Sequence, residues 1–280
     1  MKKFIILALI LLLIPGASLL AQKERVIEES FQSKKKVKIK LVLGNCLIKD
    51  SRDDRVHVHL KYSYPDDQFE AILKEKGRML YFQEKFHGRN PDGESKWTIS
   101  VPENVEVDFN SATGDLTVDN FNGELDGNSG TGTIELSNVT GKFDLNSGTG
   151  DVIINSGKGD FDLNSGTGEV QIENSEGNFD ANSGTGDVEG RNITFEDDGD
   201  FNSGTGEVEI TAPKGSDFNL SLNSGTDDAV LDMDGQPLKG YFELSAHKRK
   251  GRIICPVKFD NEKEYDNGDG RYERKSFTRG

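Results

Sequence analysis

The sequence has few of the residues from which membrane bundles and most catalytic sites are built. Apolar residues make up 33% of its 280 positions, and it contains two cysteines, four histidines and one tryptophan. Residues 110–235 include no histidine, cysteine, tyrosine or tryptophan. This composition excludes a bundle of membrane helices, which needs runs of about 20 apolar residues. It also removes from residues 110–235 most side chains that act as general acids, general bases or nucleophiles.

Positive charge is also scarce. The chain has 34 basic and 49 acidic residues, a net charge of −15. Residues 110–235 hold 26 acidic and 4 basic residues, a net charge of −22, whereas basic runs lie on both sides at 34–36 and 248–250. Phosphate backbones are bound by clustered lysine and arginine. The charge therefore argues against a nucleic-acid partner and predicts an acidic rod with basic ends.

The longest apolar run is at the N-terminus. Lys2 and Lys3 precede apolar residues 4–14, Pro15 and Gly16 interrupt the run, and Ala21 follows. A basic start, a short apolar stretch and a small residue before the cut are typical of a secretory signal peptide. We expect residues 1–21 to be removed, no membrane span to remain, and the protein to be periplasmic, cell-surface or secreted. An uncleaved anchor helix is the alternative.

The two cysteines, Cys46 and Cys255, could form a disulfide in an exported protein. A disulfide needs Cα atoms within about 7 Å of each other. The elongated fold argued below would place the two residues far apart, which favours two separate, poorly exposed thiols.

A repeat dominates the centre of the chain. Glycines recur every nine residues from Gly114 to Gly186, and the pentapeptide Asn-Ser-Gly-Thr-Gly recurs at every second glycine. The asparagines of the pentapeptide and of its two degenerate copies are 18, 18, 18, 18, 20 and 21 residues apart. They are Asn110, Asn128, Asn146, Asn164, Asn182, Asn202 and Asn223. The repeating unit is therefore 18 residues long and consists of two nine-residue halves.

Each half alternates apolar and polar residues before a polar turn, as in Val152-Ile153-Ile154 and Phe161-Asp162-Leu163. Alternation with period two indicates a half-buried strand. A two-strand unit cannot bury its inner face alone, but stacked copies can. The pattern predicts an all-β fold, a parallel β-solenoid (β-helix) of 18-residue coils. Two apolar columns should fill its interior: Leu125, Phe143, Phe161 and Phe179, facing Leu116, Ile134, Val152, Val170, Val188 and Val208.

The flanks should close the two ends of the solenoid. Residues 22–109 form a strand-rich lead-in, with strands at 37–43 and 55–62, and Gly44-Asn45 resembles a degenerate coil turn. The spacing of Phe69, Ile72 and Leu73 predicts one short helix over 66–76, with a hairpin to 78–86 as the alternative. Residues 110–259 comprise the repeats and closing strands at 240–246 and 252–259. Residues 260–280 form a polar, flexible tail.

The coil motif behind a signal peptide resembles a bacterial putative-adhesin domain family of unknown function. The similarity covers about residues 36–280 and includes Val101-Pro102 before the first coil. It implies an extracytoplasmic β-solenoid with an adhesive or envelope role. It implies no catalytic residues.

In-register stacking also predicts columns of carboxylates. One aspartate lies two residues before six of the repeat asparagines and should point outward. These are Asp108, Asp126, Asp144, Asp162, Asp180 and Asp200. A second column should contain Asp115, Asp151, Glu169, Asp187 and Glu207. Like charges about 4.8 Å apart repel by about 1 kcal/mol per pair in water, and bound Ca²⁺ would relieve this repulsion. The first column is the candidate metal site, weakly binding Ca²⁺, and we expect no resident cofactor.

Three functions fit the sequence. A non-enzymatic exported adhesin or envelope scaffold, binding an unidentified envelope or surface protein or glycan, fits best. A lyase-like carbohydrate enzyme on a β-helix is the alternative, but it needs a base and cationic groups beside the carboxylates. A cation-binding surface array is the third. His57 and His59 share one strand face, and we expect them to be surface residues rather than metal ligands. The oligomeric state stays open.

Overall fold

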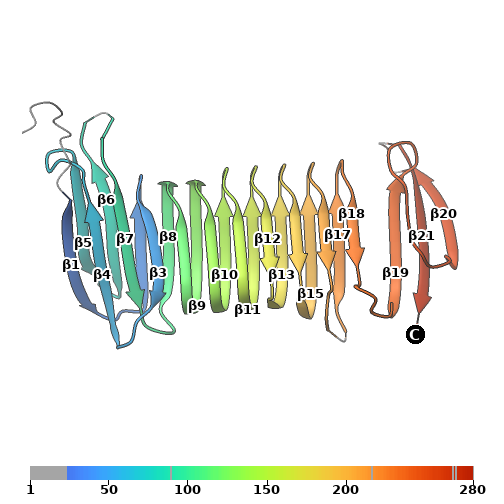
Figure 1. Cartoon of the computed structure of the whole chain (residues 1–280), viewed down its shortest axis with the longest axis horizontal. Helices are drawn as coiled ribbons and strands as arrows, with labels where there is room; N and C mark the ends of the chain where they lie inside the picture. The colour runs from blue at the N-terminus through green and yellow to red at the C-terminus, as the bar shows by residue number, and fades with distance from the viewer. Residues whose placement is uncertain (1–23, 89, 216, 267, 269, 280) are drawn as a thin grey trace, which may run out of the picture.

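The computed structural model describes residues 24–279 except 89, 216, 267 and 269. The predicted signal peptide lies outside the described residues. Strands are the only regular elements in the part that is described, with no helix and so none able to cross a membrane. The fold is an all-β parallel solenoid with strand-rich flanks at both ends, as the repeat predicted (Figure 1).

The central coils stack with residue i beside residue i+18. Phe143 lies opposite Phe161, and Phe161 opposite Phe179, in parallel ladders. The strands are β8 (Glu106–Thr113), β9 (Leu116–Thr131), β10 (Ile134–Ser147), β11 (Val152–Ser165), β12 (Val170–Glu173), β13 (Glu176–Ser183), β14 (Val188–Arg191), β15 (Thr194–Ser203), β16 (Val208–Thr211), β17 (Asn219–Ser224) and β18 (Ala229–Asp232). Strands β9 to β11 bend around a corner, so each contributes to both sheets of the solenoid.

Every member of the two predicted apolar columns is buried in the interior. Further apolar columns are buried beside them, one with Leu136, Ile154 and Ile172 and another with Leu145, Leu163 and Phe201. The rings of Phe143, Phe161 and Phe179 stack with centroids 5.2 Å apart and interplanar angles of 13° and 6°. In-register strands place identical rings one coil apart, at about the 4.8 Å strand spacing. The aromatic stack therefore follows directly from the sequence repeat.

Glycine is required where successive turns approach each other. A Cβ built at Gly150 would lie 2.1 Å from the carbonyl oxygen of Gly132. The other corner uses asparagine with a left-handed backbone, as at Asn138 and Asn174, with φ of 55° and 51°. Within the repeats, the asparagines with positive φ are therefore those at the corner that contains Asn138 and Asn174, rather than those of the pentapeptide.

The solenoid begins earlier than the clear repeats do. Strands β2 (Lys36–Leu41) and β3 (Asn45–Asp50) form a coil that pairs in parallel with β8 and β9. Gly44-Asn45 is its turn, as predicted. Strands β6 (Met79–Phe86) and β7 (Ser95–Val101) stack on β2 and β3 from the other side.

Antiparallel strands then close this end. Strand β5 (Phe69–Lys76) pairs with β6, β4 (Arg55–Tyr62) with β7, and β1 (Arg25–Gln32) with β4. The short helix predicted over 66–76 is wrong, and the alternative hairpin is correct. Phe69, Ala71 and Leu73 alternate inward opposite Phe86, Glu84 and Phe82, so pairing with β6 overrides the helical spacing.

A buried glutamate completes the first turn. Glu84 is 1% exposed. Its Oε2 accepts hydrogen bonds from the backbone N–H groups of Val42, Leu43 and Gly44, at 2.8, 3.1 and 3.2 Å. Its Oε1 accepts from Ser95 Oγ at 2.5 Å and Trp97 Nε1 at 2.8 Å. The carboxylate thus satisfies the donors of the first turn.

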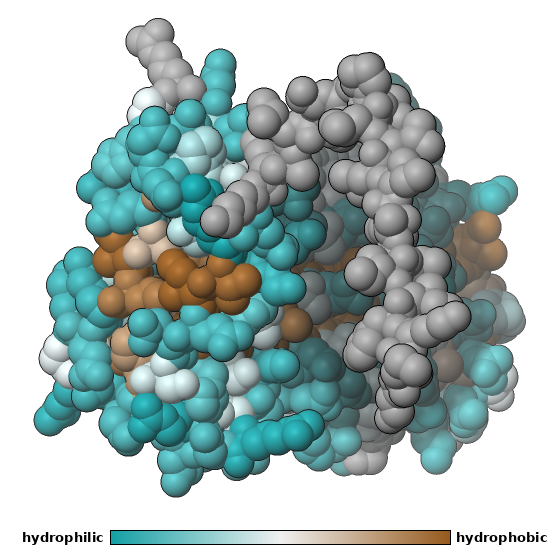
Figure 2. All heavy atoms as spheres, turned by 60° about the vertical axis from the view of Figure 1, so that its left-hand side comes forward, coloured by the Kyte–Doolittle hydropathy of each residue, from teal (hydrophilic) through white to brown (hydrophobic). Residues whose placement is uncertain are grey.

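The N-terminal end of the solenoid remains partly apolar. Ile27, Phe31 and Leu73 are half-buried against the core. A space-filling view from this side shows apolar atoms bordered by hydrophilic ones (Figure 2). Glu75 also faces this end, opposite Leu80, and pairs with Lys34 at 3.0 Å. A charge at this position disfavours the addition of another strand.

The C-terminal segment forms a separate antiparallel sheet in the order β19 (Gly240–His247), β21 (Arg271–Arg279), β20 (Asn261–Asp266). The predicted strand at 252–259 is absent. The tail predicted to be flexible instead supplies β20 and β21. Phe277 in β21 is buried and stacks on Phe242 at 4.8 Å, a long-range pairing that a polar, glycine-rich tail does not reveal.

Both cysteines are free, as expected. Cys46 is buried in β3, and burial together with the charge of Glu84 raises the pKa of its thiol. Cys255 lies half-buried before the C-terminal hairpin.

Candidate functional site: an acidic column on the outer face

The structure brings all six predicted aspartates into one column. Asp108, Asp126, Asp144, Asp162, Asp180 and Asp200 occupy matched positions on successive strands. All except Asp108 are exposed. We call this set the aspartate column, and the surface that carries it the aspartate face. That face belongs to the sheet containing β5, β6, β2, β8, β13, β15, β17 and the C-terminal parts of β9 to β11.

Each aspartate is held by the asparagine two residues later. The Nδ2 atoms of Asn128, Asn146 and Asn164 donate to the Oδ1 atoms of Asp126, Asp144 and Asp162, at 2.6, 2.8 and 2.7 Å. The same contact recurs at the other three rungs, at 2.5, 2.7 and 3.0 Å. One oxygen of each carboxylate is therefore engaged within its own coil, and its charge remains on the surface.

A ladder of asparagine amides forms in the last coils. Asn182, Asn202 and Asn223 each donate to the preceding asparagine of the column, at 3.2, 2.9 and 2.8 Å. An amide nitrogen carries two hydrogens, so Asn182 and Asn202 each bond both their own aspartate and the neighbouring asparagine. The ladder stabilises the stacking of coils, which supports a structural role for the repeat asparagines.

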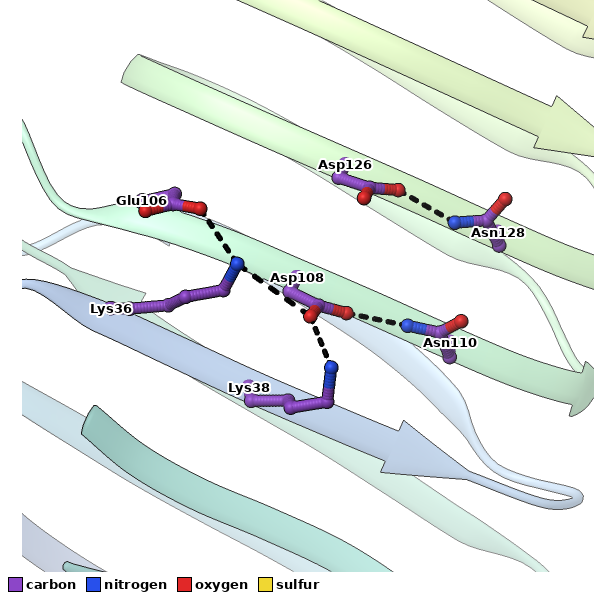
Figure 3. Close-up of polar contacts among 7 residues, drawn as sticks. All are labelled: Lys36, Lys38, Glu106, Asp108, Asn110, Asp126 and Asn128. Carbon is purple, nitrogen blue, oxygen red and sulfur yellow. Dashed lines mark hydrogen bonds and ion pairs between the residues drawn. The ribbon is translucent and has the colours of Figure 1, made fainter. Parts of the chain in front are cut away.

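Lysines occupy the N-terminal end of the column (Figure 3). Lys38 lies beside Asp108 in the register and its Nζ bonds the Oδ2 of that residue. Lys36 Nζ is 2.6 Å from Glu106 Oε1 and 3.7 Å from Asp108 Oδ2. The hydrogen bond to Glu106 raises the pKa of Lys36. The side chain of Asp108 is only 10% exposed, so the first rung of the column is neutralised by the chain itself.

Sequence reasoning missed these lysines as part of the column. Residues 36–50 lack the repeat pentapeptide, and only Gly44-Asn45 marked them as a coil. Aligning Gly44 with Gly114 places Lys38 at the aspartate position, a signal that was present in the sequence.

The second carboxylate column has a structural role. Asp115, Asp151 and Asp187 accept hydrogen bonds from backbone N–H groups one coil later, at 2.9, 2.9 and 2.8 Å. At the end of this column, burial and then neighbouring acids, chiefly Glu209, raise the pKa of Glu207. These side chains secure turns and leave fewer oxygens available to a ligand.

The carboxylates stand in rows and do not converge. Among the described residues, no group of three or more histidine, cysteine, aspartate or glutamate side chains could hold a metal ion. A cation on the aspartate column would bridge successive rungs, each offering one oxygen that its asparagine does not bond. The predicted Ca²⁺ site therefore remains a prediction.

His57 and His59 lie in a shallow groove of about 690 Å³ on the opposite outer face, between β1, β3, β4 and β7. His57 lies between Ser30 Oγ at 2.7 Å and Asp53 Oδ1 at 2.8 Å. The hydrogen bond from His57 lowers the pKa of Asp53. His59 lies 3.6 Å from Glu28. Their side chains are 39% and 38% exposed, as expected for surface residues.

A second hollow, of about 240 Å³, lies where the insertion in β15 shifts the register with β13. It is lined by Phe161, Asn178, Phe179, Asp180, Asp198 and Asp200. The two phenylalanines are each 3% exposed. The sequence spacing of 20 residues marked this insertion but did not predict the hollow.

A protein-family model matches the greater part of this chain. The model of the Toastrack DUF4097 family matches residues 34–245. The chain belongs to this family. The match includes the early coil of the Toastrack fold at β2 and β3 and ends within β19. No curated protein matches the sequence.

Several solved structures are similar to this Toastrack chain at low identity. A putative cell adhesion protein from Clostridium sporogenes is 14% identical, with 69% of this chain and 100% of that chain covered and a TM-score of 0.39. A putative adhesin from Bacteroides fragilis is 14% identical, with coverage of 75% and 98% and a TM-score of 0.38. A putative lipid binding protein from Parabacteroides distasonis is 12% identical, with coverage of 75% and 97% and a TM-score of 0.43.

Proposed function

We propose that this Toastrack protein is a non-enzymatic, exported binding module that serves as an adhesin or scaffold in the cell envelope. The observation that carries the proposal is the aspartate face, on which one aspartate recurs on six successive coils. A repeated outer surface of this kind suits extended contact with a partner. The names of the similar adhesion proteins are compatible with this role.

Export follows from the N-terminal pattern of residues 1–21. The acidic, asparagine-rich surface is compatible with a protein that must stay soluble outside the cytoplasm. The absence of cysteine pairing places no limit on this location, because many exported domains fold without disulfides once their core is large enough.

A lyase-like enzyme fits the geometry less well. Such chemistry needs a base and a cationic group beside the reacting sugar. The bases closest to the aspartate column in the described structure, Lys36 and Lys38, are engaged with Glu106 and Asp108. The exposed carboxylates of the column, from Asp126 to Asp200, share one repeated environment, so none of them is set apart as an acid or a base.

The proposal is tested by capture from an envelope fraction on immobilised protein, residues 22–280. A variant with Asp126, Asp144, Asp162 and Asp180 replaced by asparagine keeps the size and hydrogen bonding of the face but removes its charge. A control variant replaces four exposed acids elsewhere in the same way. A ligand held by the native and control proteins and lost from the column variant supports the proposal.

The same preparation should be incubated with acidic polysaccharides. New reducing ends or unsaturated products, formed in proportion to protein, would contradict a non-enzymatic role. Capture that is equal on all three proteins would contradict a role for the aspartate face.

A further inference from the structure

The charge of the aspartate face changes from positive to negative along the solenoid. On its first three strands, β5, β6 and β2, the outward side chains include six lysines and one glutamate. They are Lys36, Lys38, Lys40, Lys74, Lys76, Lys85 and Glu70. On the next three strands, β8 to β10, the outward charges are five acids and one lysine. They are Glu106, Asp108, Glu124, Asp126, Asp144 and Lys142.

The sign change is sharpest along a single column. The register places Lys74 beside Tyr81, Tyr81 beside Lys38, and Lys38 beside Asp108. Asp126 and Asp144 follow. Lys74 Nζ lies 5.4 Å from the ring centroid of Tyr81 and Lys76 Nζ lies 5.2 Å from it. No carboxylate partner within the described structure is recorded for either ammonium group.

Reversing this column makes it complementary to itself. A two-fold axis parallel to the strands, between β2 and β8 and just outside the sheet, would place Lys74 over Asp144 of a second molecule. The in-chain pair of Lys38 and Asp108 would lie over its own copy. Tyr81, whose hydroxyl donates to Gln83 Oε1 at 2.7 Å within the chain, would lie over Asp126. Each contact would occur twice, as a two-fold interface requires.

We propose that the N-terminal half of the aspartate face is a self-association surface whose partner is a second, antiparallel copy of this chain. Six strands at about 4.8 Å, with about 24 Å of strand length, give roughly 700 Å² per copy. Such an area lies near the roughly 800 Å² per partner of standard interfaces. Beyond β10 the two acidic rods point away from each other, so their like charges do not face one another.

The ionic strength of the solution determines whether this contact forms. The net charge of −15 per chain repels two copies when salt is very low. At about 0.1 M ionic strength the Debye length is about 10 Å, so distant charges are screened while facing pairs still attract. At about 1 M the facing pairs are screened as well. Association should therefore be strongest near 0.1 M NaCl and lost near 1 M.

The test is sedimentation velocity of residues 22–280 over a concentration series, with paired charge reversals. Lys74→Glu makes one side of the contact between Lys74 and Asp144 acidic, and Asp144→Lys makes the other side basic. Each variant changes one exposed side chain. Each should weaken self-association at least about tenfold, because both symmetric Lys74–Asp144 pairs become repulsive. Mixing the two variants should restore a one-to-one dimer.

The control is Lys250→Glu in the C-terminal segment. It produces the same change in net charge as the first variant, at an exposed position off the aspartate face, and should leave association unchanged. A native chain that stays monomeric at about 0.1 M NaCl and high concentration would overturn the proposal. A dimer that survives both reversals, or two variants that fail to associate when mixed, would also overturn it.

Discussion

Replacing Glu84 with glutamine should destabilise the N-terminal coils. Glutamine has the same shape but keeps one acceptor oxygen, and its other terminal atom becomes an NH₂ donor. Either the three backbone N–H groups of the first turn or the two side-chain donors would then face another donor. Glu84 is 1% exposed, so water cannot readily replace the lost acceptor.

The magnitude follows from these contacts. A hydrogen bond to a charged group contributes about 1.5–3 kcal/mol, and each buried donor left unsatisfied costs about 1–3 kcal/mol. With at least two of five donors unsatisfied, we expect a loss of about 3–6 kcal/mol in the free energy of unfolding. Domains of this kind are stable by only about 5–15 kcal/mol, so the effect should be large.

The assay is urea denaturation followed by far-ultraviolet circular dichroism and tryptophan emission. Trp97 is the only tryptophan and donates directly to Glu84, so its emission reports on this site. In the variant, emission should change at lower urea than the circular dichroism does. Glu70→Gln, on the exposed face of the neighbouring strand, is the control and should change the midpoint little. Equal midpoints for Glu84→Gln and the native chain would refute the reasoning.

Four further predictions concern the coils and the thiols. Phe161→Ala should cost about 3–5 kcal/mol, whereas the outward Asp162→Ser should be neutral or stabilising; equal losses in thermal melts would contradict the inside–outside assignment. Gly150→Val should lower the melting temperature strongly, since its Cβ would lie 2.1 Å from a carbonyl oxygen; an unchanged melt would refute this. Iodoacetamide should label Cys255 in the folded protein and spare Cys46 until urea is added, as mass spectrometry would show. Calcium should raise the melting temperature little beyond NaCl at matched ionic strength, because each column aspartate already bonds an asparagine; a stoichiometric heat of binding, lost when the column is changed to asparagine, would show instead a true cation site.

The coils could be predicted because the sequence repeat itself specifies which residues contact each other. In parallel, in-register stacking, a residue's main neighbour is its own counterpart one unit away. The positions of Phe161 and Asp162 therefore followed from spacing alone. The six aspartates were placed correctly for the same reason, although spacing could not show that each is held by its own asparagine.

The flanks were harder because their contacts are not repeated. Residues 66–76 satisfy a helical spacing through Phe69, Ile72 and Leu73, and a strand spacing through Phe69, Ala71 and Leu73. Only the pairing with β6 decides between them. The C-terminal sheet depends likewise on Phe242 meeting Phe277 across 35 residues of chain. Local pattern does not contain this information.

The identical edges of successive coils bear on how such a protein can change in length. Every coil offers the next one the same hydrogen-bonding edge that it receives, and five copies of one pentapeptide lie in the gene product. Recombination between two copies would insert or delete a whole coil without breaking an interior contact. The capping strands at the N-terminus and the separate sheet at the C-terminus would be carried along unchanged. The number of coils encoded in the gene therefore sets the distance between the N-terminal capping strands and the C-terminal sheet. This distance would change in steps of about 4.8 Å.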